Sequence, residues 1–248
     1  MIIPRQEDVI HRVWLYRLLT GIVDNRTLSQ ALIFKGGTCA TMLGFLDRFS
    51  VDLDFDLIDS KNEQVVRKEL HGILKNLGLT VKDESKNVPQ FFLKYPVPKQ
   101  NQRNTLKLDI LPHPPKSNKY TPQFLMEIDR MANCQTIETM FANKLVALMD
   151  RHAKNTTIAG RDAYDIHHFF LAGYGFNQEV IFERTGLTTL SFLMNLGAFI
   201  EKYITQSLLE RDLNALLPSD TFRQTVRHLK QETLDFLRVE IEKQKIKK

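Results

Sequence analysis

Three aspartates alternate with apolar residues over residues 51–57, which read Val-Asp-Leu-Asp-Phe-Asp-Leu. Side chains two positions apart on a strand point to the same face, so Asp52, Asp54 and Asp56 would share one face while the apolar residues bury the other. Alternate positions lie roughly 7 Å apart, a distance that carboxylates can bridge by holding metal ions between them. The segment indicates either a metal-binding strand or a half-exposed strand with acidic solvent positions.

The same acids also match part of a calcium-binding loop. Asp52, Asp54, Asp56 and Glu63 fall at positions 1, 3, 5 and 12 of an EF-hand loop, but Leu57 stands where that loop needs glycine for its sharp turn. The apolar alternation also argues against a polar loop. We therefore prefer the strand and set calcium aside.

A glycine pair precedes the acidic segment in Lys35-Gly36-Gly37-Thr38, between a short apolar run and a helical pattern. Glycines at such a junction let backbone N–H groups approach phosphate oxygens at a helix N-terminus. The run lacks both the Walker spacing and the GxGxxG pattern, so by itself it indicates only a turn. Its meaning depends on the acids about fifteen residues later.

A further carboxylate, Asp109, stands between apolar neighbours in residues 105–111, with Lys107 on its own face. Strand pairing could place Asp109 beside Asp52 and Asp54. A lone acid on a strand is usually only exposed to solvent. A glycine turn, an Asp-x-Asp strand and a later isolated acid together form a much rarer set.

The elements that must position these residues follow from the apolar periodicity. We predict a helix over residues 5–22, a strand over 31–35, a helix over 38–46, a strand over 51–57 and a helix over 62–77 capped by Gly78. Further strands are predicted over residues 91–95 and 105–111. The Pro-rich residues 112–122 are the best candidate linker.

From residue 136 onward the pattern is almost wholly helical, over residues 137–151, 162–171 and 189–203, with a last helix starting near Pro218-Ser219-Asp220. The fold class is therefore α+β, a small mixed-sheet domain followed by an all-helical one. We place the domains at residues 1–130 and 131–248, with the cleft between them as the default binding site.

Composition and charge limit the classes of protein to which this chain could belong. Thirty-four Lys and Arg against 29 Asp and Glu give a net charge of +5, which mildly favours polyanionic partners. Cys39 and Cys134 have no zinc or disulfide-framework spacing, which suits a reducing cytoplasm. The charged N-terminus does not read as a signal peptide, and no stretch approaches the length of a membrane span. We expect a cytoplasmic protein with no membrane partner.

The run Gly36-Gly37-Thr38, followed by Arg48-Phe49-Ser50-Val51-Asp52-Leu53-Asp54, resembles the AbiEii/AbiGii toxin family of the DNA polymerase beta-like nucleotidyltransferase superfamily. Two later motifs of that family, a helical lysine and an Arg-Asp-x-x-Asp segment, resemble Lys144 and residues 161–165. The resemblance spans roughly residues 30–170, and the last eighty residues are unmatched.

The resemblance implies roles for individual residues. Asp52 and Asp54 would hold Mg²⁺, and Lys144 and Asp165 would complete the site from the helical domain. The residues that would contact the nucleoside triphosphate are Ser50 and the turn Gly36, Gly37 and Thr38. Nucleotidyl transfer needs metal ions, expected here as two Mg²⁺ held by Asp52, Asp54 and Asp109, and cations for the departing pyrophosphate. Arg48 and Lys144 are the obvious cations, and Lys35 and Lys107 could substitute.

Several of these residues have plainer explanations. Lys144 could extend from a partly apolar helix face, and Asp162 could be a first-turn acid favoured by the helix dipole. The functional reading predicts that Lys144→Ala weakens triphosphate use and melts near wild type. Adjacent His167 and His168 point in different directions on a helix, so we interpret them as structural. Cys39 is most simply a core residue.

The resemblance implies a toxin of a type IV toxin–antitoxin or abortive-infection system, with a separately encoded antitoxin. Its reaction would be transfer of a nucleotide to an RNA acceptor, the tRNA 3′ end above all, with release of pyrophosphate. Basic residues on or near one face of the final helix, Arg223, Arg227, His228 and Lys230, could position that acceptor. The alternatives are transfer to a small molecule or a protein, and a non-catalytic nucleotide- or RNA-binding module.

Overall fold

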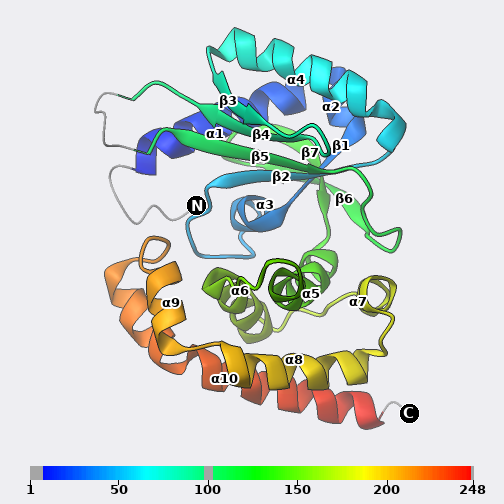
Figure 1. The fold of residues 1–248 in the computed structure, drawn as a ribbon, viewed down its shortest axis with the longest axis vertical. Helices are drawn as coiled ribbons and strands as arrows, with labels where there is room; N and C mark the ends of the chain where they lie inside the picture. The colour runs from blue at the N-terminus through cyan, green and yellow to red at the C-terminus, as the bar shows by residue number, and fades with distance from the viewer. Residues whose placement is uncertain (1–7, 98–102, 247–248) are drawn as a thin grey trace. The chain divides into compact units, whose positions relative to one another are not determined.

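The computed structural model of the protein describes residues 8–97 and 103–246 (Figure 1). The chain divides into two compact units. Unit 1 comprises Met1–Pro114 and Lys119–Thr136, and unit 2 comprises Pro115–Asn118 and Ile137–Lys248. Unit 1 thus runs to Thr136, whereas the sequence places the domain boundary at residue 130, and a short piece of the Pro-rich stretch packs with unit 2.

Unit 1 is built on one mixed sheet in the order β3-β4-β5-β2-β1-β7-β6. β2 pairs in parallel with β5, and β1 pairs in parallel with β7; the other neighbours are antiparallel. The strands are β1 (Leu32–Lys35), β2 (Asp52–Leu57), β3 (Thr80–Glu84), β4 (Gln90–Lys94), β5 (Thr105–Leu111), β6 (Tyr120–Leu125) and β7 (Arg130–Gln135).

Helices cover both faces of this sheet. α1 (Asp8–Asp24), α2 (Arg26–Ala31) and α4 (Glu63–Leu77) lie on one face, and α3 (Gly36–Met42) lies on the other (Figure 1). The 3-10 turn η1 (Ser60–Asn62) leads into α4. The alternation of β2 is as predicted, because Leu53, Phe55 and Leu57 are buried in the core. Residues 5–7 of the predicted first helix lie outside the described residues.

The C-terminal ends of α3 and α4 both involve a glycine with a left-handed backbone. Gly78 takes the left-handed conformation (φ 70°) at the end of α4, which confirms the predicted cap. The helix predicted over residues 38–46 is wrong at both ends, because α3 starts at Gly36 and stops at Met42. Gly44, with φ 76°, ends it, and the N–H groups of Gly44 and Phe45 return to the Thr41 and Ala40 carbonyls.

The prediction of a linker over residues 112–122 is wrong at its end, since Tyr120 and Pro122 belong to β6. Proline cannot donate to a strand ladder, but β6 is the last strand of the sheet and one of its sides needs no partner. The antiparallel partner β7 was also not predicted. Together these two strands extend the sheet to Gln135.

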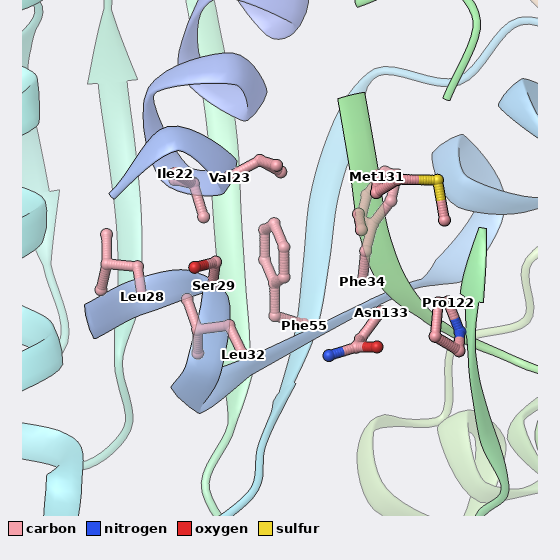
Figure 2. A pocket seen from close by; sticks show the side chains of 11 residues that line it. Ile22, Val23, Leu28, Ser29, Leu32, Phe34, Phe55, Pro122, Met131 and Asn133 are labelled. Atoms are coloured by element: carbon pink, nitrogen blue, oxygen red, sulfur yellow. The ribbon is translucent and has the colours of Figure 1, made fainter. Parts of the chain in front are cut away.

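Behind the acidic face of β2, an apolar pocket of about 250 Å³ opens between the helices and the sheet (Figure 2). Phe34 and Phe55 line it, on the face opposite Asp54 because strand positions alternate. Its remaining lining residues are Ile22, Val23, Leu28, Ser29, Leu32, Pro122, Met131, Ala132 and Asn133. The lining side chains are uncharged, so the pocket does not suit a triphosphate.

Unit 2 is helical, apart from its short segment 115–118. Its helices are α5 (Ile137–Asn155), α6 (Gly160–Leu171), α7 (Gln178–Thr185), α8 (Thr189–Tyr203), α9 (Gln206–Leu213) and α10 (Ser219–Ile246). An aromatic cluster forms part of its core, with Phe141 packing edge-on against Phe169, Phe170 and Phe176. Across the described ranges, no helix combines the length and the apolar character that crossing a bilayer requires.

Candidate active site

The acids of the sheet meet on two neighbouring strands. In the parallel pairing of β2 with β5, Asp54 lies directly opposite Asp109, and Asp52 lies opposite Lys107. Asp52 and Asp54 share one face of β2, so all four side chains project to the same side of the sheet. The acids are partly exposed, and the sheet brings together the three that the sequence singles out.

Asp109 is held by two donors in this arrangement. Lys107 Nζ lies 2.6 Å from Asp109 Oδ2, and Gln90 Nε2 donates to the same oxygen at 3.1 Å. Among the described residues, no group of three His, Cys, Asp or Glu side chains is already gathered as a metal site. The donor chemistry nevertheless fits magnesium, because carboxylate oxygens are its preferred ligands and the Lys107 ammonium shows that this face accepts a cation.

The side chains around Gly36 and Gly37 leave no room for a side chain at either position. Gly36 has φ 80°, and a Cβ built there would lie 2.3 Å from Asp54 Oδ2. A Cβ on Gly37 would lie 2.7 Å from an Arg48 guanidinium nitrogen and 3.0 Å from Ser50 Oγ. Only glycine therefore lets the turn approach Asp54 this closely.

The predicted phosphate contacts are more buried than the sequence suggests. The Thr38 hydroxyl donates to the Asp52 carbonyl at 2.5 Å and lies 2.9 Å from Ser50 Oγ, with Thr38 fully buried. Arg48 is 3% exposed and donates to the Phe49 carbonyl. These contacts fix the start of β2 against α3.

Lys35 and the third acid of β2 form a separate network. Asp56 is fully buried and accepts hydrogen bonds from Lys35 Nζ at 2.5 Å and Gln135 Nε2 at 2.6 Å, with Tyr120 OH at 3.2 Å. Residues of three other strands, β1, β6 and β7, therefore contact this carboxylate. Asp56 thus belongs to a different network from Asp52 and Asp54. Glu63, the last acid of the calcium pattern, lies in α4 and pairs with Arg67, which agrees with the preference for a strand.

In unit 2, Lys144 of α5 is held by two acids of α6. Its ammonium lies 2.9 Å from both Asp162 Oδ1 and Asp165 Oδ2, and both carboxylates are fully buried. Arg151 Nε reaches the other oxygen of Asp162 at 2.8 Å. Lys144 is therefore locked in a charged cluster, and Asp162 and Arg151 belong to it, although sequence reasoning favoured only Lys144 and Asp165.

Electrostatics agree with this geometry. Burial by itself raises the pKa of Asp162, but Lys144, Arg151 and Arg161 outweigh it and lower the pKa to about 2. Asp162 also lies in the first turn of α6, where the helix dipole favours an acid, as the plainer explanation from the sequence requires. The spacing in Arg161-Asp162-x-x-Asp165 places Asp162 and Asp165 on one helix face. From that spacing the pairing of Asp162 with Lys144 could have been predicted.

The contacts of His167 and Cys39 indicate structural roles. His167 Nε2 lies 2.7 Å from Glu232 Oε2, which joins α6 to α10. Cys39 is fully buried, and burial together with Cys134 raises the pKa of its thiol. Neither environment suggests a nucleophile.

Comparisons with known proteins agree on one family. The family described as nucleotidyl transferase AbiEii toxin, Type IV TA system, matches residues 17–239. The fold is similar to a candidate nucleotidyltransferase from H. pylori (TM-score 0.63, 19% identity, 98% of this chain and 99% of that chain). It is also similar to JHP933 from Helicobacter pylori (TM-score 0.59, 20% identity, 98% and 97%). No curated protein matches the chain.

The solved structures share the fold with this chain, and the family match covers both the glycine turn and the helical lysine cluster. The match also extends through the helical residues that the motif run left unmatched, into α10. The chain belongs to the AbiEii nucleotidyltransferase toxin family of type IV toxin–antitoxin systems.

Proposed function

We propose that this protein transfers a nucleoside monophosphate from a nucleoside triphosphate to an RNA acceptor, with the tRNA 3′ end as the favoured acceptor. The observation that carries the proposal is the placement of Asp54 opposite Asp109 on parallel strands, beside a Gly36 that tolerates no side chain. An acceptor hydroxyl oxygen forms a bond to the α-phosphorus while the bond to the β-phosphate oxygen breaks. The hydroxyl proton leaves to solvent, and pyrophosphate is released.

Magnesium dependence is part of this proposal. Asp52, Asp54 and Asp109 would hold the metal, expected as two Mg²⁺ ions, and Lys107 would release Asp109 when it binds. Bound there, the ions would activate the acceptor hydroxyl and neutralise the charge that develops on the phosphates. The chain's own task is to hold the carboxylates, and Gly36 and Thr38 keep β2 and α3 close enough for that.

We assign triphosphate binding to the turn around the acids, at Lys35, Gly36, Gly37, Thr38, Arg48 and Ser50. The family resemblance adds Lys144 and Asp165 as catalytic residues. The buried positions of Thr38 and Arg48 favour backbone contact with phosphate over side-chain contact at those two residues. The Lys35 side chain is 20% exposed while its ammonium pairs with the buried Asp56, so part of this side chain is open to solvent.

The choice of RNA as acceptor is supported by the net charge of +5, and the type IV toxin–antitoxin family implies a cognate antitoxin as a partner. Such a toxin would act in the cytoplasm and stop growth by blocking translation. Transfer to a protein or a small molecule uses the same acids, and a non-catalytic module would bind triphosphate without releasing pyrophosphate. The acceptor distinguishes these activities.

The test is to incubate wild type and Asp52→Ala with total cellular RNA and each α-labelled triphosphate, and to resolve RNA and protein on separate gels. Label entering tRNA-sized RNA with wild type alone supports the proposal. Label on protein only, or in no macromolecule, refutes the RNA acceptor. Pyrophosphate release without any labelled macromolecule would identify a small-molecule acceptor or hydrolysis.

A further inference from the structure

The last helix of the chain carries its charges unevenly. Residues 222–231 of α10 contain Arg223, Arg227 and Lys230 and no acid. At spacings of four and three residues, these three cations lie in one stripe along the helix. His228 lies beside that stripe on the neighbouring face.

The two arginines of the stripe are exposed to solvent. Within the described part of the chain, neither Arg223 nor Arg227 forms an ion pair or a hydrogen bond, and their side chains face solvent. The C-terminal half of the same helix differs. There Arg238, Lys243 and Lys245 pair with Asp235, Glu240 and Glu242, at distances of 2.7, 3.3 and 2.7 Å.

The stripe is unfavourable for the helix that carries it. Like charges four residues apart, as in Arg223 and Arg227, repel each other and destabilise a helix. An anion supplied from outside the chain would relieve that repulsion.

The third cation of the stripe has a structural contact. Lys230 Nζ donates to the Glu201 carbonyl at 2.7 Å, near the C-terminal end of α8, where a cation is favourable. The acids nearest to the stripe in sequence are Asp220 and Glu232, and Glu232 is engaged with His167; Glu201, whose carbonyl Lys230 contacts, is exposed. The two arginines are therefore the part of the stripe available to a partner.

We propose that the Arg223–Arg227 stripe of α10 binds the phosphate backbone of the RNA acceptor. This inference rests on the proposed function, since it assigns a surface to the acceptor named there. Two guanidinium groups about one helical turn apart suit successive phosphates of a nucleic-acid strand, and arginine binds phosphate with paired N–H donors. Contacts of this kind position RNA without reading its bases.

The test compares two double variants that each remove two positive charges from α10. Arg223→Gln with Arg227→Gln removes the two arginines of the stripe, and Arg238→Gln with Lys245→Gln removes exposed cations that already have acid partners. Binding of 5′-fluorescein-labelled tRNA to the full chain is followed by anisotropy from 50 to 200 mM salt. Melting of each variant checks that the helix is intact.

The stripe variant should bind tRNA about tenfold more weakly at low salt, with the slope of log K against log salt reduced by about 1.5, because two counterion-releasing contacts are lost. The paired-cation control should bind like wild type. Equal loss in both variants, or unchanged binding in the stripe variant, overturns the inference. If the stripe variant loses binding to poly-glutamate but not to tRNA, the stripe serves an acidic protein and the inference is also overturned.

Label transfer in the same preparations separates the two proposals. If wild type labels RNA and the stripe variant still binds tRNA as tightly as wild type does, only the stripe assignment is refuted. Wild type that neither binds nor labels RNA refutes the RNA acceptor, and the stripe assignment with it.

Discussion

Two clusters of carboxylates in this chain are built in opposite ways. The acids of β2 and β5 sit on an open strand face, partly exposed, and Asp109 is 33% exposed beside Lys107. The acids of α6 are fully buried, and Lys144 and Arg151 neutralise them from α5. Both clusters contain a cation, but Lys107 and Asp109 are partly exposed, whereas Asp162 and Asp165 are fully buried.

This difference separates ligand binding from positioning. A partly exposed carboxylate can exchange Lys107 for a metal ion at low cost, because water and the ion replace the lost contact. A buried carboxylate that loses its cation is left uncompensated, which is strongly destabilising. Substitutions in the sheet cluster should therefore affect activity, and substitutions in the helical cluster should affect stability first.

The largest expected effect is on activity in the sheet cluster. Asp54→Asn should lower the rate of transfer about a thousandfold, because an amide cannot supply the charge that Mg²⁺ requires and metal assistance is worth several kcal/mol. Melting should stay near wild type. The exposed Asp83 on edge strand β3, changed to Asn, is the control and should retain full activity. An active Asp54→Asn protein would disprove the metal assignment.

The next effect is on stability in the helical cluster. Lys144→Ala leaves Asp162 and Asp165 without their shared cation and should lower the free energy of unfolding by about 3 kcal/mol, measured by urea titration. This reverses the expectation from sequence that the variant melts near wild type. Lys144→Arg keeps the charge and should keep most of the stability. If Lys144→Arg also restores transfer, the lysine acts through its charge; if transfer stays low, the ammonium itself contacts the substrate.

Gly36 connects geometry to activity in the sheet cluster. Gly36→Ala should lower transfer about a hundredfold, since the added Cβ would overlap Asp54 Oδ2 and the left-handed backbone disfavours a side chain. Gly72→Ala is the matched control, because an alanine there meets open space in α4 and should stabilise the helix slightly. Normal transfer by Gly36→Ala would show that Asp54 need not approach the turn.

The smallest effect is the pH dependence of the buried pair. The folded pKa of Asp162 is lowered to about 2, below its unfolded value of 3.8, so its stabilisation is present above pH 3.8 and is lost as the pH falls toward 2. At neutral pH the shift corresponds to about 2 kcal/mol. The difference in unfolding free energy between wild type and Asp162→Asn should shrink as the pH falls from 3.8 toward 2. A constant difference would contradict the ion-pair account.

Sequence alone predicted the parts of the fold that depend on local rules. Alternation identified β2 and the shared face of Asp52 and Asp54, and a left-handed glycine identified the end of α4. β7 escaped prediction because Arg130–Gln135 has little apolar alternation, and only Cys134 and Gln135 are buried there.

The candidate site was predicted less completely than the fold. The engagement of Lys35 by Asp56, and of Lys144 by Asp162, joins residues on different elements. Periodicity describes one element at a time and gives no information about such contacts. Burial of Arg48 and Thr38 was missed for the same reason, since it depends on how α3 packs against β2.

The central claim, that the acids of β2 and β5 form one metal site for the triphosphate, is tested most directly by counting bound metal. Mn²⁺ can replace Mg²⁺ and be followed by electron paramagnetic resonance, with a non-hydrolysable triphosphate present. We predict about two tightly bound ions in wild type and loss of at least one in both Asp54→Asn and Asp109→Asn, with Asp83→Asn unchanged. Equal Mn²⁺ binding by wild type and the two site variants would contradict the claim.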